Sequence, residues 1–263
     1  MMNEIQTYLE EDGLLHCAVC KEPVEAFYPK GSFLEMRKHH RQCACERQAY
    51  AEEVKYYKEK EHQERVVRNK KICFEEKEME DFIFQNVDRD SGAIRIAKEY
   101  VANWQKMKKN HMGYLFWGPV GTGKSYLAAC IANALLEQEV TVKMTNFNTI
   151  LNDLFAAEDK TEYVRLLNVY ELLIIDDLGV ERNSEYALEN IFSVIDWRYR
   201  SGKPLIITTN LPLAQLKQEI KIEKKRIYDR ILERCIPVKI DGVSRREAMA
   251  NDNMQTMKNI LKI

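Results

Sequence analysis

The 263-residue sequence lacks the features that mark several classes of protein. Its 40 lysines and arginines are balanced by 41 aspartates and glutamates, which excludes a uniformly basic nucleic-acid coat and a strongly acidic disordered chain. No stretch approaches 18 consecutive apolar residues, so we expect no transmembrane helix and no membrane partner. The first residues, MMNEIQTYLEED, are acidic and predict no signal peptide. These absences predict a cytoplasmic protein, in which disulfide bonds are rare.

The length and composition suggest one full domain together with a smaller folded segment. Hydrophobic residues make up 45% of the sequence, and charged residues make up 31%, above the average of about 25%. Residues 1–45 are rich in turns and cysteine, which predicts a small separate module. Residues 46–81 contain no glycine or proline and mix acidic and basic side chains at helical spacing. They predict a charged helical linker, followed by a larger domain at 82–263.

From residue 82 onward, short apolar runs alternate with helical patterns. The runs predict strands at 114–117, 140–144, 172–175, 205–209 and 236–240. The run at 172–175 is apolar without a break, as in a strand that is covered on both faces. Strands that alternate with helices in this way predict an α/β fold with a five-stranded parallel sheet between layers of helices.

A glycine-rich turn follows the first of these strands and opens a helix. It matches GxxxxGK[ST] in full, through Gly118, Pro119, Val120, Gly121, Thr122, Gly123, Lys124 and Ser125. The glycines allow phosphate oxygens to approach backbone N–H groups at the positive end of the helix dipole. We expect Lys124 to reach the outer phosphates and Ser125 to bind Mg²⁺, so the turn predicts a nucleoside triphosphate site.

Polar side chains follow two of the other predicted strands. Asp176 and Asp177 come directly after the run at 172–175, at the strand end where ligands bind in open parallel sheets. We expect Asp176 to hold Mg²⁺ and Asp177 to orient and polarise the attacking water. Asn210 ends the next strand, where its amide would hold the water or the terminal phosphate, although asparagine is also a common turn residue.

Three arginines share one face of a predicted helix. Arg226, Arg230 and Arg234 follow the spacing i, i+4, i+8. This is typical either of a solvated basic stripe or of an arginine finger directed at the γ-phosphate of a neighbouring subunit. A Ser-Arg-Arg segment at 244–246 follows the last predicted strand, where it would contact the nucleotide of its own subunit.

Four of the seven cysteines lie before residue 46. Cys17 and Cys20 form a CxxC pair, and after 22 intervening residues Cys43 and Cys45 form a CxC pair. Four thiolates match the tetrahedral preference of Zn²⁺, and a bound metal would help to fold a segment with little core of its own. We therefore expect an all-cysteine zinc site. The alternative ligands nearby in the sequence are His16, His39 and His40.

The order of these motifs resembles that of AAA+ ATPases. More narrowly, residues from about 95 to 246 resemble the DnaC/DnaI helicase loaders and the related IstB ATPases, in the segments GYLFWGPVGTGKSYLAACIANALL, LLIIDDLG, IITTN, RIYDRILERC and DGVSRR. The 23 residues after Ile240 are too few for the four-helix lid of many AAA+ proteins, and the narrower group similarly lacks a full lid. Many similar chains are encoded by phages and mobile elements of Firmicutes.

The resemblance implies a role for each motif. It implies an ATP and Mg²⁺ site at Lys124 and Ser125, with Asp176 and Asp177 as the Walker B acids. It further implies that Asn210 acts as sensor I, Arg226 as the arginine finger with Arg230 as the alternative, and Arg246 as the sensor II arginine. The second acid is Asp177 rather than the glutamate of most AAA+ proteins, and we therefore expect slow ATP hydrolysis.

The resemblance also implies partners. DnaI-type loaders carry an N-terminal zinc module that contacts the replicative helicase, and their ATPase domain binds single-stranded DNA. By this resemblance the protein loads a DnaB-type helicase hexamer onto single-stranded DNA in the initiation of replication, and its self-association completes each ATP site. The alternative is an IstB-like helper of a transposase, a group that usually has a helical N-terminal extension in place of the cysteines. A third hypothesis, a zinc module with an inactive nucleotide switch, is disfavoured by the intact motifs.

Overall fold

The computed structural model describes residues 6–86, 92–179, 184–242 and 244–261. The chain divides into two compact units, one up to Glu64 and one from Arg65 onward. The division falls inside the segment predicted as a linker, because helix α1 (Ala44–Cys73) starts in the first unit and ends in the second. No helix among the described residues is long and apolar enough to cross a membrane.

Over its described residues, 6–64, the first unit contains two small antiparallel sheets and most of α1. Strands β1 (Thr7–Leu9) and β2 (Leu15–Cys17) form one sheet, and β3 (Glu25–Phe27) and β4 (Lys38–His40) form the other. Its buried apolar cluster consists of Cys17, Val24 and Cys43. A core of this size is too small to stabilise such a segment without a cross-link or a metal.

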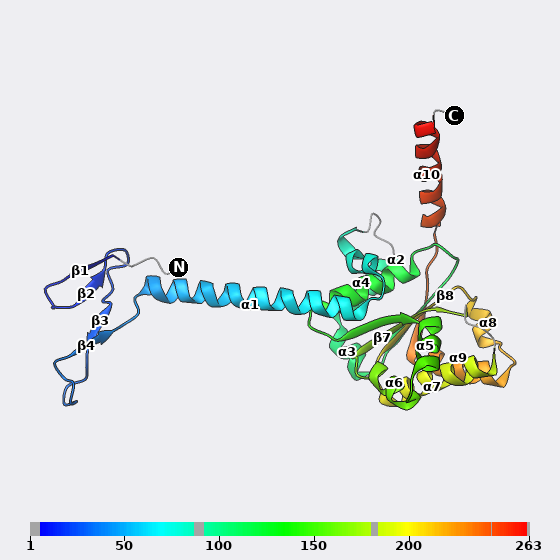
Figure 1. Cartoon of the computed structure of the whole chain (residues 1–263), viewed down its shortest axis with the longest axis horizontal. Coiled ribbons are helices and arrows are strands. Elements are labelled where there is room, and N and C mark those ends of the chain that lie inside the picture. The colour runs from blue at the N-terminus through cyan, green and yellow to red at the C-terminus, as the bar shows by residue number, and fades with distance from the viewer. Residues whose placement is uncertain (1–5, 87–91, 180–183, 243, 262–263) are drawn as a thin grey trace. The chain divides into compact units, whose positions relative to one another are not determined.

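The second unit is built on a parallel sheet, which has five strands over the described residues (Figure 1). The strands lie in the order β6-β7-β8-β5-β9. They are β5 (Gly113–Trp117), β6 (Val142–Asn146), β7 (Leu172–Leu178), β8 (Leu205–Thr209) and β9 (Cys235–Lys239). The predicted α/β fold with a five-stranded parallel sheet is confirmed. Strand β6 begins two residues later than expected, and β7 continues through both aspartates.

Helices cover both faces of this sheet. One layer consists of α2 (Gly92–Ala102), α3 (Trp104–Lys109) and α4 (Lys124–Leu136), and the other of α5 (Phe147–Ala156), α6 (Lys160–Leu167), α7 (Glu185–Ser201) and α9 (Ile222–Arg234). Alternate residues of a strand face opposite layers, so Phe116 of β5 packs in the first layer and Leu115 in the second. This alternation gives the sheet its unbroken apolar runs.

The remaining elements of the second unit are short or peripheral. Helix α1 ends at Cys73, before the end of the predicted linker, and the 3₁₀ turns η1 (Lys77–Asp81) and η2 (Phe84–Asn86) follow it. The chain leaves the helical path here because Phe74 is buried in the first helical layer and Phe82 packs against that layer. Helix α8 (Leu213–Lys217) follows β8, and α10 (Arg245–Leu261) follows β9.

Candidate nucleotide site and cysteine cluster

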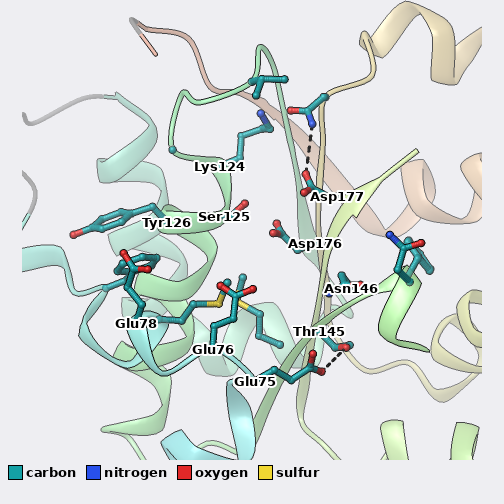
Figure 2. Close-up of a pocket in the computed structure, with 18 of the residues that line it drawn as sticks. Glu75, Glu76, Glu78, Lys124, Ser125, Tyr126, Thr145, Asn146, Asp176 and Asp177 are labelled. Carbon is teal, nitrogen blue, oxygen red and sulfur yellow. Dashed lines mark hydrogen bonds between the residues drawn. The ribbon is translucent and has the colours of Figure 1, made fainter. Parts of the chain in front are cut away.

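A cavity of about 670 Å³ lies at the carboxyl ends of the strands, beside the glycine-rich turn (Figure 2). It gathers most of the residues that the sequence predicts for a nucleotide site. Those that line it are Val120, Gly121, Gly123, Lys124, Ser125, Asp176, Asp177 and Asn210. The other three residues of the turn, Gly118, Pro119 and Thr122, do not line the cavity.

The turn between β5 and α4 has the backbone conformation that only glycine adopts easily. Gly121 has a φ of 80°, and a Cβ at this position would lie 2.2 Å from the Ser244 Oγ. The Ser-Arg-Arg segment therefore starts directly beside the turn. The buried Lys124 ammonium donates hydrogen bonds to the carbonyl oxygens of Gly118 at 3.0 Å and Pro119 at 2.7 Å. This places a positive charge inside the turn, where it can meet phosphate oxygens.

The two acids lie at an irregular point of β7. The pairing of β7 with β8 shifts register between Ile175 and Leu178, and Asp177 has a left-handed backbone with a φ of 56°. The Asp177 N–H donates to the Thr208 Oγ1 at 2.9 Å, and the Asn210 amide donates to the Asp177 Oδ1 at 3.5 Å. The irregularity directs two successive carboxylates toward the cavity, which a regular strand with its alternating side chains would not do.

Asp176 is mostly buried and faces Ser125 (Figure 2). Thr208 Oγ1 donates a hydrogen bond of 2.5 Å to its Oδ1. Burial raises the pKa of Asp176 because it penalises the charged form, while the hydrogen bonds from Thr208 and Ser125 oppose the shift. A buried carboxylate beside a hydroxyl is suited to hold a divalent cation, because a cation offsets the cost of burying the charge.

Several residues in or beside this cavity were not predicted from the sequence. Thr208 touches both acids, and three glutamates reach the cavity from the segment that follows α1. Glu75 accepts a hydrogen bond from Thr145 Oγ1 at 2.9 Å (Figure 2). It accepts a second hydrogen bond from Thr149 Oγ1 at 3.1 Å. The other two glutamates are Glu76 and Glu78. No local pattern marks these residues, since tertiary packing brings their segment to β6.

The predicted arginines lie elsewhere. Arg226 does not line the cavity of its own chain, and its guanidinium carbon lies 4.4 Å from the centre of the Phe192 ring. Arg230 forms an ion pair of 2.6 Å with Asp196. Arg246 belongs to α10, but its side chain lies outside the described residues.

The structure brings the four predicted cysteines of the first unit together. The sulfurs of Cys17, Cys20, Cys43 and Cys45 all lie within 4.8 Å of one another, a spacing compatible with one Zn²⁺ about 2.3 Å from each sulfur. Backbone hydrogen bonds, first from Glu22, lower the pKa of the Cys20 thiol to about 6. A side-chain hydrogen bond with Cys20 raises the pKa of the Cys45 thiol to about 12. Thiolates so close repel one another, and a bound cation would let all four ionise.

The nearby histidines are engaged outside this cluster. His16 contacts the Lys21 carbonyl oxygen and the Asp12 carboxylate, both at 3.0 Å. His39 contacts the carbonyl oxygen of His40, and the His40 ring lies 3.3 Å from Glu46. The group of metal-ligating side chains found in the described residues contains cysteines alone.

With this geometry in view, comparison with known proteins gives the family. A family model described as IstB-like ATP binding protein matches residues 42–252. The chain belongs to this family. Its description, ATP binding, agrees with the triphosphate site predicted from the turn.

Curated relatives of this IstB-like chain include two replicative helicase loaders. DnaC of Escherichia coli (strain K12) is 29% identical over 144 residues, which cover 53% of this chain and 56% of DnaC. The chain thus spans about half the length of that relative. DnaI of Bacillus subtilis (strain 168) is 21% identical over 271 residues, which cover 93% of this chain and 82% of DnaI.

A solved structure supports the same relationship. The crystal structure of DnaI superposes with a TM-score of 0.58 and 27% identity, over 68% of this chain and 99% of that chain. The resemblance to DnaC/DnaI and IstB proteins is therefore confirmed, and so is the AAA+ fold.

Proposed function

We propose that this chain is an ATP-dependent loader that places a DnaB-type replicative helicase on single-stranded DNA in the initiation of replication. The observation that carries the proposal is the match with the Bacillus subtilis helicase loader DnaI, which covers 93% of this chain. A match of that extent takes in both the cysteine-bearing unit and the ATPase unit. The match with DnaC supports the proposal for only part of the chain, since it covers 53% of this chain.

ATP binding would use the glycine-rich turn and the first acid. The Lys124 ammonium would leave its carbonyl partners for the outer phosphates, while the turn's N–H groups bind the remaining oxygens. Ser125 and Asp176 would hold Mg²⁺, which neutralises charge on the phosphates. The cavity is large enough for a nucleotide, at about 670 Å³.

Hydrolysis would depend on Asp177 and Asn210. The left-handed backbone at Asp177 exposes its carboxylate to the cavity, where it would orient a water molecule and polarise it for attack on the γ-phosphate. Asn210, 3.5 Å from that carboxylate, would hold the same water or the phosphate. An aspartate reaches less far than a glutamate, so we expect slow turnover, stimulated by DNA or the helicase.

Self-association would complete the site. Arg226 is exposed and does not line its own chain's cavity, which supports its action on the γ-phosphate of a neighbouring subunit. Arg246 would act as sensor II within its own subunit, because its segment begins beside the turn at Ser244.

Single-stranded DNA would bind an exposed aromatic pair between the helices of the second layer. Phe155 of α5 is 81% exposed, and its ring centre lies 6.4 Å from that of Tyr186 of α7. The Lys160 ammonium lies 4.7 Å from the centre of the Tyr186 ring. Bases stack on such rings without sequence preference, and a lysine beside them meets the phosphates.

The cysteine module would bind the helicase. Four cysteines would hold Zn²⁺ and so stabilise a unit whose own apolar core is very small. The module of residues 1–45 would then present its loops to the helicase hexamer, and the ATPase domain at 82–263 would capture the DNA.

A second candidate function is that of an IstB-like helper of a transposase. The family description favours it, and the family model matches only from residue 42. The match leaves out Cys17 and Cys20, so it does not account for the cysteine module. We regard the loader as the better supported function for this reason.

Co-elution with the replicative helicase of the host tests the proposal. The full chain is mixed with the helicase hexamer and ATP or ADP, and light scattering gives the mass of the complex. We expect a stable complex with the unmodified chain and none with Cys17→Ser/Cys20→Ser. The matched control is Cys73→Ala, which removes a buried thiol outside the cluster.

The outcomes separate the two candidate functions. A complex that depends on the cluster cysteines supports the loader, and its dependence on ATP or ADP tells whether the nucleotide controls assembly or release. If no complex forms under any condition, the loader hypothesis is wrong, and a cognate transposase is the next partner to test.

A further inference from the structure

Helices α6 and α7 lie side by side in the second helical layer (Figure 1). A cleft of about 330 Å³ opens near the C-terminal ends of both helices. It shares no lining residue with the nucleotide cavity. The residues that line it are Arg165, Asn168, Trp197, Arg200 and Ser201.

Trp197 is the aromatic residue of this cleft, and it is 40% exposed. From Tyr186 to Trp197, helix α7 makes about three turns, so the two rings project from the same face, about 16 Å apart along the axis. Tyr186 belongs to the aromatic pair that we propose as a stacking site for DNA bases. The cleft continues that face of α7 toward the C-terminal end of the helix.

Each of these two rings has a cation of α6 beside it. The Lys160 ammonium lies 4.7 Å from the centre of the Tyr186 ring, and Arg165 lines the cleft together with Trp197. A ring with an adjacent cation, repeated along one helix face, fits a strand of nucleotides, because each base can stack and each phosphate is negative. An apolar protein segment would use the rings but not the repeated cations.

The two arginines of the cleft remain available to an anion. Arg165 is 62% exposed, and its Nη1 lies 3.8 Å from the Glu162 Oε2, a long and exposed ion pair that contributes little. The Arg200 Nε lies 2.8 Å from the Asp196 Oδ2, but the side chain is 74% exposed, which leaves the rest of the guanidinium in contact with solvent. Both guanidiniums can therefore bind phosphate oxygens.

Positive charge also lies close to the cleft. The Lys203 ammonium donates a hydrogen bond to the Asn168 carbonyl oxygen at 2.6 Å, and the Arg198 guanidinium donates one to the Tyr170 carbonyl oxygen at 2.9 Å. Burial and the charge of Arg198 lower the pKa of Lys203. The summed field of these cations attracts an anionic strand to this end of α7.

We propose that the cleft at Trp197 is a second contact site for single-stranded DNA. One base stacks on Trp197, and Arg165 and Arg200 bind the flanking phosphates. The proposal rests on the proposed function, because it extends the strand from the Phe155–Tyr186 pair along the face of α7. The distance between the rings corresponds to about five nucleotides at the 3.4 Å spacing of a helical strand, and to fewer in an extended one.

Fluorescence anisotropy with a labelled oligothymidylate of about 16 nucleotides tests the proposal on the full chain with Mg²⁺ and ATP. Trp197→Ala should weaken the affinity by about 5- to 150-fold, the range for one base stacked on an aromatic ring. Arg165→Gln and Arg200→Gln should each lower the slope of log affinity against log salt concentration by about 0.7. Because Tyr186 and Trp197 are far apart, the losses from Tyr186→Ala and Trp197→Ala should multiply in the double variant.

Two control variants separate contact with the strand from general effects. Trp197→Phe should keep most of the affinity, since it keeps a ring. The strand should quench the tryptophan fluorescence of the unmodified chain, and Trp197→Phe should lose most of that quenching. Arg95→Gln removes an equal charge from an exposed position of α2, in the other helical layer, and should change neither the affinity nor the salt slope.

Each outcome decides between explanations. Weaker binding in Trp197→Ala, with retention and lost quenching in Trp197→Phe, supports the proposal. Unchanged affinity in Trp197→Ala, or unchanged quenching in Trp197→Phe, overturns it, while a loss in Tyr186→Ala would still support the proposed DNA binding. If the cleft variants keep the strand but lose the helicase complex, the cleft is a protein-docking surface and the proposal is wrong. If the unmodified chain binds no strand, the DNA-binding part of the proposed function is wrong too, and the helicase co-elution result stands independently.

Discussion

Thr208→Val removes one hydroxyl from the candidate nucleotide site and keeps the size of the side chain. That hydroxyl is fully buried, donates to the Asp176 carboxylate at 2.5 Å and accepts from the Asp177 N–H at 2.9 Å. Its removal leaves a buried carboxylate oxygen and a backbone N–H without this partner. Each such group costs about 1–3 kcal/mol, so we expect the free energy of unfolding to fall by about 2–6 kcal/mol.

The effect should depend on pH. Burial raises the pKa of Asp176 above its ordinary value of 3.8, so the folded protein favours the protonated carboxyl. The stability that this preference contributes is fully present below pH 3.8 and is lost as the pH rises through the raised pKa. Thr208 opposes the shift, because its hydrogen bond stabilises the carboxylate. The loss in Thr208→Val should therefore be larger at pH 7 than near pH 4, and Mg²⁺·ATP should dissociate at a higher pH on acidification.

Urea unfolding and nucleotide titration measure these effects, with Thr209→Val as the matched control. Thr209 is equally buried, and its hydroxyl donates to the Leu178 carbonyl at 2.7 Å and accepts from the Leu211 N–H at 3.1 Å. We expect Thr209→Val to lose stability to a similar degree at both pH values and to keep its dependence on Mg²⁺. A loss below about 0.5 kcal/mol in Thr208→Val, or identical pH dependence in both variants, would refute the reasoning.

Three further predictions concern the rest of the molecule. Asp177→Asn should keep ATP binding but lower phosphate release about 100-fold or more, whereas Lys124→Ala should lose both. Binding is measured with a fluorescent nucleotide and hydrolysis with a phosphate assay. Equal binding defects in the two variants would contradict separate roles for Lys124 in binding and Asp177 in hydrolysis. Arg198→Met should lower the free energy of unfolding by about 3 kcal/mol, because the buried guanidinium donates to three backbone carbonyls and burial lowers its pKa to about 9; a change below about 1 kcal/mol in urea would contradict this. A zinc chelator should make residues 1–64 sensitive to protease while the ATPase unit stays resistant, and equal sensitivity of both units would contradict a local structural role for the metal.

The nucleotide turn and the sheet were predictable because their signals are local. The residues of the turn are contiguous from Gly118 to Ser125, and the apolar runs reflect strands covered on both faces. The ends of elements were less predictable. Strand β7 extends to Leu178 because pairing with β8 carries it past two aspartates, which local propensity disfavours in a strand.

The partners of the site residues were not predictable in the same way. Glu75 reaches Thr145 across 70 positions of sequence, and Thr208 reaches Asp176 across 32. Such contacts depend on which segments the sheet order and the helical layers bring together, and a single sequence carries no periodic signal for them.

The sequence by itself determined the chemistry available to this protein: a phosphate-binding turn, two acids at a strand end and four cysteines in two close pairs, all set by residue type and short spacing. Only the tertiary structure decided how the two arginines of α9 differ. Both guanidiniums lie against the Phe192 ring, but Arg230 forms an ion pair with Asp196, whereas Arg226 is exposed. Both arginines have the same helical spacing, so the distinction arises from what α7 places opposite each of them.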